Sequence, residues 1–105
     1  MKTVSAQEFA ALFDDHTVVI DVREPAEYAQ AHVPGAVLIP LAQLPARKGE
    51  VPDTGPVYVI CASGNRSKVG ASVLEASGID AYSVEDGTAG WLNIGRPYVA
   101  GREPR

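Results

Sequence analysis

The sequence contains a single cysteine, Cys61, and only two histidines, His16 and His32, among its 105 residues. One cysteine excludes an internal disulfide, and these three residues lack the ligand spacing of a structural zinc site. We therefore expect no bound metal. An unpaired thiol is typical of proteins in a reducing compartment. With a disulfide and a zinc site excluded, the role of the Cys61 thiol becomes the main question.

The sequence also has little positive charge and no long apolar run. Its 13 acidic and 9 basic residues give a net charge of -4, which argues against general nucleic-acid binding. The longest uncharged stretch, residues 33–46, is interrupted by prolines and is shorter than the roughly 20 residues of a membrane-spanning helix. The N-terminal residues lack the apolar segment of a signal peptide. We expect a cytoplasmic protein that binds neither nucleic acid nor membrane.

The length fits one domain, residues 1–105. Short apolar or β-branched runs predict five strands, at residues 3–4, 17–22, 37–39, 57–60 and 81–84. Helical patterns alternate with them, at residues 6–13, 25–33, 66–76 and 89–92, together with a helical turn at 41–44. This alternation favours an α/β fold, with a five-stranded, mostly parallel sheet and helices on both faces. Residues 45–56 are expected to form a surface connection, and the tail from about residue 100 is expected to fray.

Cys61 follows directly after the predicted strand at 57–60. Ligands of open α/β sheets bind at the carboxyl ends of strands, although a buried structural cysteine is a common alternative. The next six residues favour a reactive thiol: Ala62, Ser63, Gly64, Asn65, Arg66 and Ser67. Small residues allow the loop to curl with its N–H groups inward, and the following helix adds its partial positive charge. We predict that the loop favours the thiolate of Cys61, which is the nucleophilic form.

Two side chains of this loop have further predicted roles. Arg66 adds a permanent cation beside the thiol. Ser67 is expected either to cap the helix or to donate its hydroxyl to the sulfur.

Asp21, Arg23 and Glu24 fall at the end of another predicted strand, beside the same edge of the sheet. One hypothesis is that they orient the loop, with Glu24 pairing with Arg66. The simpler hypothesis, which we favour, is that they cap the next helix and form a local ion pair. For His32 we prefer a hydrogen-bonding role in the turn to a role as general base, because an activated thiolate needs no base.

Four segments resemble the signatures of single-domain rhodaneses, which are sulfurtransferases. Residues 21–28, DVREPAEY, resemble the first signature, and residues 32–36, HVPGA, with Ile39-Pro40 resemble the second. Residues 61–67, CASGNRS, resemble the active loop, and residues 87–91, GTAGW, resemble the closing motif. Their order and spacing are family-like over nearly the whole chain.

The resemblance implies that Cys61 takes a sulfane sulfur from a small anionic donor such as thiosulfate. The resulting persulfide passes its outer sulfur to cyanide, a thiol or a protein. The resemblance also implies that residues 62–67 bind the substrate and that no metal or organic cofactor is needed. Rhodaneses that use thiosulfate often carry a basic residue where this chain has Ala62. Because this cation is missing beside an anionic donor, we expect thiosulfate to be a poor substrate. Asp86 stands where many relatives have a glycine, so the backbone is expected to differ there.

Two alternative functions remain. The first is a persulfide carrier or binding module that acts with a protein partner, in which turnover of small molecules is negligible. The second is a cysteine-dependent phosphatase. Four residues separate Cys61 from Arg66, one fewer than in the related phosphatases, and the shorter loop suits a sulfur atom better than a tetrahedral phosphate.

Overall fold

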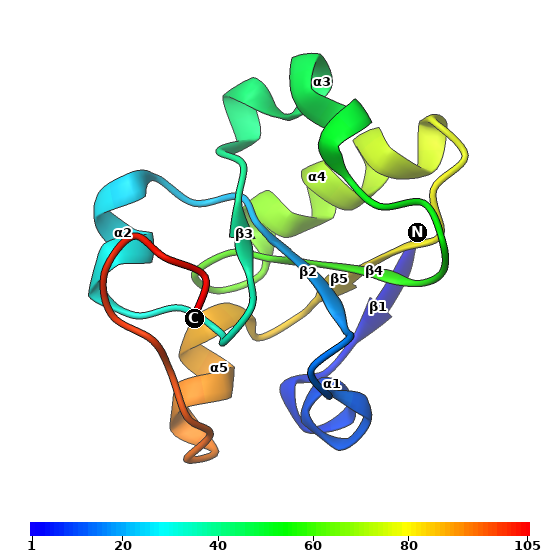
Figure 1. Cartoon of the computed structure of the whole chain (residues 1–105). Helices are drawn as coiled ribbons and strands as arrows, with labels where there is room; N and C mark the ends of the chain where they lie inside the picture. The colour runs from blue at the N-terminus through cyan, green and yellow to red at the C-terminus, as the bar shows by residue number, and fades with distance from the viewer.

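Five parallel strands form one sheet in the order β1-β5-β4-β2-β3 in the computed structural model, which describes residues 1–105 (Figure 1). The strands are β1 (Lys2–Val4), β2 (Val18–Asp21), β3 (Val37–Leu38), β4 (Val57–Ile60) and β5 (Ala81–Val84). Every pair of neighbours in the sheet is parallel. The predicted α/β fold with five strands is therefore confirmed.

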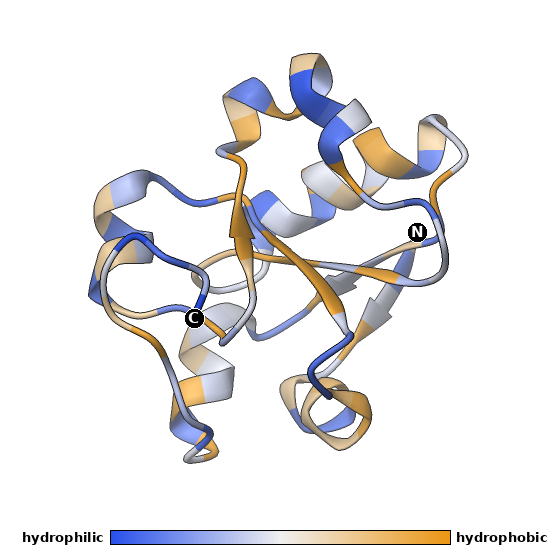
Figure 2. Ribbon diagram, in the orientation of Figure 1, coloured by the Kyte–Doolittle hydropathy of each residue, from blue (hydrophilic) through white to orange (hydrophobic).

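The central strands β2 and β4 carry the continuous apolar runs of the sequence because they are covered on both faces. All four residues of β4 are buried, and Figure 2 shows the hydrophobic colour concentrated along the strands. In the register of these strands Asp21 pairs with Ile60. The ends of β2 and β4 therefore coincide, and the residues that follow both strands meet at one edge of the sheet.

Five α-helices flank the sheet: α1 (Ala6–Leu12), α2 (Pro25–Gln30), α3 (Leu44–Arg47), α4 (Asn65–Ala76) and α5 (Gly87–Asn93). Helices α3 and α4 cover one face and pack Leu44, Ala71 and Leu74 against the strands. Helices α1, α2 and α5 cover the other face, where Phe9 and Trp91 are buried (Figure 1). The domain thus has two cores, one on each side of the sheet.

Local sequence signals explain where several helices begin. Ser5 and Glu8 form the capping box at the start of α1, with Ser5 Oγ accepting from the N–H of Glu8 at 3.1 Å. Pro25 occupies the first turn of α2, where its missing N–H costs no hydrogen bond.

Two details of the helices differ from the sequence prediction. Residues 45–56 were expected to form a connection, but α3 and a 3₁₀ turn at Lys48–Glu50 lie there, because Pro45 falls in a first turn and Leu44 is buried. The sequence pattern places Val69, Val73 and Leu74 on one face of the helix at 66–76; Leu74 is buried and Val73 packs against the core, but Val69 is 54% exposed. The small residues Gly70 and Ala71 lie beside Leu74 on the buried face, and a Cβ at Gly70 would meet Val59 Cγ1 at 3.0 Å.

The C-terminal tail runs back beside α2 (Figure 1). His32 and Val99 form an isolated antiparallel bridge, and Gly101 N–H donates to the carbonyl of Ala29 at 2.7 Å. The buried ring of His32 lies 2.8 Å from the carbonyl oxygens of both Tyr28 and Glu103. The predicted hydrogen-bonding role of His32 is therefore confirmed.

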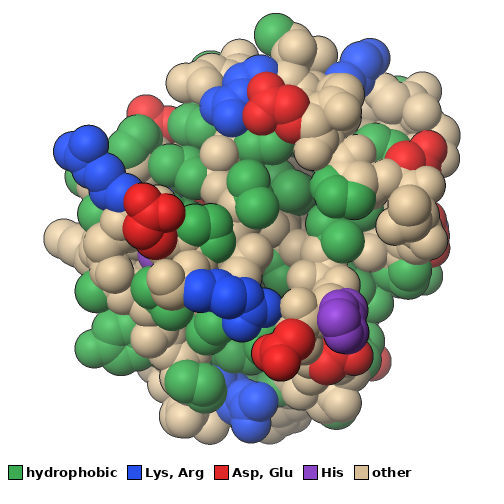
Figure 3. Space-filling view, in the orientation of Figure 1, with side chains coloured by type: hydrophobic (Ala, Val, Ile, Leu, Met, Phe, Trp, Pro, Cys, Tyr) green, Lys and Arg blue, Asp and Glu red, His purple; other side chains and the backbone are tan.

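Charged side chains are mixed on the face shown in Figure 3, where basic and acidic groups alternate without a continuous basic area. No helix combines the length and apolarity needed to cross a membrane. No group of three or more His, Cys, Asp or Glu side chains is placed to hold a metal ion.

Candidate active site

Cys61 lies at the carboxyl end of β4, and its side chain is 1% exposed. The loop of residues 62–64 joins it to α4. The first turn of α5 holds the start of this loop, because the N–H of Thr88 donates to the carbonyl of Cys61 at 2.8 Å and the N–H of Ala89 donates to the carbonyl of Ala62 at 3.1 Å. Two helices therefore position the thiol, α4 after the loop and α5 beside it.

Gly64 gives the loop its curl. Its φ of 110° lies in the left-handed region, which glycine adopts without steric cost. The N–H of Gly64 donates to the sulfur of Cys61 at 3.1 Å. Helix α4 begins at the next residue, so the positive end of its dipole is next to the sulfur. Asn65 and Ser63 are exposed, and Ala62 is half-buried.

The hydroxyl of Ser67 is the side-chain partner of the sulfur. Its Oγ lies 3.5 Å from Cys61 Sγ, 3.1 Å from the carbonyl oxygen of Gly64 and 2.8 Å from Oγ of Ser83. Ser83 belongs to β5 and is fully buried. Ser83 is not among the residues predicted from the sequence, where its one signal is a serine inside an otherwise apolar strand.

Opposing effects set the pKa of the Cys61 thiol. Burial raises the pKa, but the Ser67 hydroxyl and the backbone N–H groups of Ser67, Gly64 and Ser63 lower it, and the net result is a lowered pKa. At a given pH a larger fraction of Cys61 is therefore ionised than of a free cysteine.

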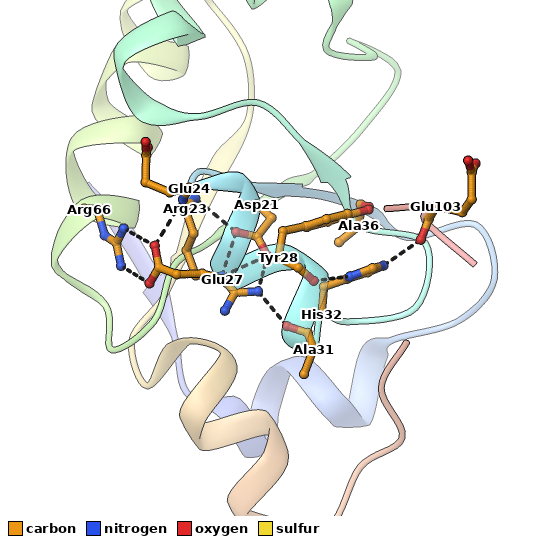
Figure 4. A network of polar contacts seen from close by, with 10 residues as sticks. All are labelled: Asp21, Arg23, Glu24, Glu27, Tyr28, Ala31, His32, Ala36, Arg66 and Glu103. Atoms are coloured by element: carbon orange, nitrogen blue, oxygen red, sulfur yellow. Dashed lines mark hydrogen bonds and ion pairs between the residues drawn. The ribbon is translucent and has the colours of Figure 1, made fainter. Parts of the chain in front are cut away.

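Arg66 forms an ion pair with Glu27. The two guanidinium nitrogens donate to the two carboxylate oxygens at 2.7 and 2.8 Å (Figure 4). The less favoured hypothesis, in which Glu24 pairs with Arg66, is wrong. Glu24 is the N-cap of α2 and is exposed, with its carboxylate directed away from Arg66 in Figure 4, whereas Glu27 lies one turn further along the helix.

Asp21 and Arg23 form the local ion pair that the sequence favoured. Arg23 Nε and Nη2 donate to the Asp21 carboxylate at 2.9 and 2.8 Å, and Nη2 also donates to the carbonyl of Ala31 at 2.7 Å. Both side chains are buried. This pair joins the end of β2 to the end of α2, and Figure 4 shows it next to the Glu27–Arg66 pair.

Two surface hollows border the active loop. Ala62 lines one of them together with Arg23, Glu27 and Thr88, and Ser63 lines the other. Ala89 of α5 separates the two hollows and lines both. A substrate that approaches the thiol therefore meets the loop and the first turn of α5.

The Glu27–Arg66 pair gives a testable pH dependence. The hydrogen bonds from Arg66 lower the pKa of Glu27 from its usual 4.5 to about 2. Glu27 thus stabilises the fold above pH 4.5, and this contribution disappears as the pH falls towards 2. We expect Glu27→Gln to reduce the free energy of unfolding at pH 7 by about 1 kcal/mol or less, because the pair is partly exposed.

Urea unfolding of both proteins at several pH values measures this difference. It should shrink as the pH falls from 4.5 to 2. A difference that stays constant over this range would contradict the assignment.

Comparison with known proteins identifies the family. The sequence profile of the Rhodanese-like domain matches residues 5–94. The chain belongs to the rhodanese-like domain family. A crystal structure of a rhodanese-related protein from Thermoplasma volcanium is 28% identical and has a TM-score of 0.89, covering 98% of this chain and 100% of that chain.

Two curated relatives add functional context to the rhodanese-like fold. Thiosulfate sulfurtransferase GlpE of Tolumonas auensis is 34% identical over 99 residues, covering 92% of each protein. The putative sulfur carrier protein YrkF of Bacillus subtilis is 40% identical over 65 residues, which are 62% of this chain and 35% of that protein. These similarities support a function of the sulfurtransferase type.

Proposed function

We propose that this rhodanese-like domain transfers sulfane sulfur through a persulfide on Cys61. The observation that carries the proposal is the direct contact of the Cys61 sulfur with the N–H of Gly64 at 3.1 Å, inside a loop that starts a helix. Donors placed in this way stabilise negative charge on sulfur. The lowered pKa of the thiol supplies the nucleophile.

The transfer consists of two displacements. The Cys61 thiolate attacks the outer sulfur of the donor, and the donor's sulfur–sulfur bond breaks with its electron pair on the leaving group. With thiosulfate the leaving group is sulfite, and Cys61 holds a persulfide. A nucleophilic acceptor then attacks the outer sulfur and releases the Cys61 thiolate. The same loop groups stabilise this thiolate as nucleophile in the first step and as leaving group in the second.

The charges around Cys61 affect how strongly an anionic sulfur donor can bind. Arg66 forms an ion pair with Glu27 and Arg23 forms one with Asp21, so a carboxylate already balances the positive charge of each guanidinium before a small dianion binds. Ala62 adds no charge. We therefore expect thiosulfate to be bound weakly, and the domain to work better with a donor whose charge is low.

A protein-bound persulfide is such a donor, and a carrier role is the second candidate function. The relative YrkF, described as a putative sulfur carrier protein, supports it. The chain has a single thiol. The persulfide of Cys61 therefore has no second cysteine of the same chain to attack it and requires a separate acceptor.

The geometry disfavours the phosphatase alternative. A phosphate substrate needs the arginine of the loop as a bidentate partner. In this chain Nη1 and Nη2 of Arg66 already donate to Glu27 at 2.7 and 2.8 Å, so a phosphate would have to share this guanidinium with a carboxylate of the same charge.

Intact-protein mass spectrometry tests the proposal. The purified protein is incubated separately with thiosulfate and with cysteamine persulfide, whose ammonium group balances the charge of its persulfide, and its mass is measured after removal of excess donor. We expect a gain of one sulfur atom, with a greater occupancy from the persulfide, and loss of the added sulfur upon addition of cyanide. No added sulfur with either donor would overturn the proposal.

A further inference from the structure

A chain of buried groups extends from the reactive sulfur into the sheet. Cys61 Sγ lies 3.5 Å from Ser67 Oγ, and this oxygen lies 2.8 Å from Ser83 Oγ on β5. All three side chains are 1% exposed or less. Ser67 is the one hydrogen-bond partner of the Ser83 hydroxyl. No hydrogen bond joins Ser83 to the sulfur, so a hydrogen-bonded effect of Ser83 on the thiol must act through Ser67.

The number of available hydrogens determines the direction of these bonds when Cys61 is a neutral thiol. A hydroxyl donates one hydrogen and accepts up to two, whereas a carbonyl only accepts. Ser67 therefore donates to the carbonyl of Gly64, 3.1 Å away. It accepts one hydrogen from the thiol of Cys61 and another from Ser83. In this state the Ser67 oxygen has two donors.

Ionisation of the thiol changes this arrangement. A thiolate only accepts, so the Ser67 hydrogen turns from Gly64 to the sulfur, and the thiol no longer donates to Ser67. Ser83 is then the one remaining donor to the Ser67 oxygen. Its donation also polarises the Ser67 O–H group and strengthens the bond to the sulfur. The thiolate state consequently depends on the Ser83 hydroxyl more than the thiol state does.

We infer that Ser83 is a positioning residue that favours the thiolate of Cys61 through the hydroxyl of Ser67. The inference deepens the proposed function, since it concerns the same nucleophile, but its test needs no sulfur donor. A shifted alkylation profile in a protein that transfers no sulfur would leave this inference standing and remove only the proposed function.

Alkylation of Cys61 by iodoacetamide as a function of pH tests the inference. The chain has one cysteine, so the label reports on one site. In Ser83→Ala we expect the rate at about pH 6 to fall about 3- to 10-fold, which corresponds to the net strength of one hydrogen bond. On the alkaline plateau, where the thiol is fully ionised, the alkylation rates of Ser83→Ala and of the unmodified protein should agree within about twofold. Ser83→Thr, which keeps the hydroxyl, should restore the original profile.

Ser67→Ala provides the second arm, as a double-mutant cycle. In the Ser67→Ala background the additional Ser83→Ala substitution should leave the rate at about pH 6 unchanged within about twofold, because the connecting hydroxyl is gone. Ser72→Ala, which removes an exposed hydroxyl from α4, is the matched control and should behave as the unmodified protein. Circular dichroism checks the fold of each variant. Alanine is accommodated two positions earlier on the same face of β5, where Ala81 is fully buried.

Three outcomes would overturn the inference. The first is an unchanged profile in Ser83→Ala. The second is a rate lowered by the same factor at every pH, which would indicate altered access of the reagent to the sulfur. The third is an undiminished effect of Ser83→Ala in the Ser67→Ala background, which would exclude the route through Ser67.

Discussion

Cys61→Ser is expected to abolish both the gain of sulfur and its transfer to any acceptor. The serine hydroxyl is not ionised at neutral pH and forms no stable bond to a sulfane sulfur under these conditions. Loss of a sole nucleophile lowers turnover by at least about three orders of magnitude. Cyanide-dependent formation of thiocyanate, with thiosulfate or a persulfide as donor, measures the transfer, and intact mass measures the bound sulfur.

Stability serves as the control for this variant. Serine is close to cysteine in size, and the groups around the sulfur, Gly64 N–H and Ser67 Oγ, can hydrogen-bond to an oxygen as well. We therefore expect the unfolding midpoint in urea to change little. A Cys61→Ser protein that still transfers sulfur would show that another group is the nucleophile.

Gly64→Ala is expected to have the second largest effect. At φ 110° a Cβ on this residue would lie 1.9 Å from the carbonyl oxygen of Glu85. The Glu85 backbone has little freedom to retreat, because its N–H donates to the carbonyl of Val4 at 2.8 Å. The loop must therefore move, and the N–H that donates to the Cys61 sulfur moves with it. Losing one such donor lowers the rate at least about 100-fold.

The structure offers a matched control for this substitution. Gly78 also has a positive φ, of 85°, but a Cβ there would meet nothing within 4 Å. Gly78→Ala should cost about 1 kcal/mol of stability from backbone strain and leave sulfur transfer unchanged. Gly64→Ala should be less stable than Gly78→Ala and deficient in transfer. Equal activity of the two variants would show that the curl at Gly64 is not required.

Much of the fold could be predicted because its signals are local. The apolar runs of β2 and β4 identify central strands, since only a strand covered on both faces is apolar throughout. The buried face of α4 could not be predicted in the same way. Close approach to the sheet selects small residues there, such as Gly70, so the large residue Val69 faces outward. A pattern based on large apolar residues identifies Leu74 at this interface but places Val69 there wrongly.

The same distinction between local sequence signals and contacts made only by packing applies to the candidate site. Cys61 and its loop are contiguous in sequence, so their chemistry can be inferred from neighbouring residue types. Glu27 and Ser83 come from α2 and β5, and no local pattern connects them to the thiol. The choice between Glu24 and Glu27 as the partner of Arg66 depends on how α2 is rotated about its axis, which only the packed structure defines.

The bonds from α5 to the active loop determine the orientation of its peptide planes. In each trans peptide the carbonyl and the N–H of the next residue point in opposite directions. The carbonyls of Cys61 and Ala62 are turned towards the N–H groups of Thr88 and Ala89. The N–H groups of the same two peptide planes are thereby turned away from α5. A helix that makes no hydrogen bond to the sulfur thus sets the direction of the Ser63 N–H, which is one of the groups that lower the pKa of Cys61.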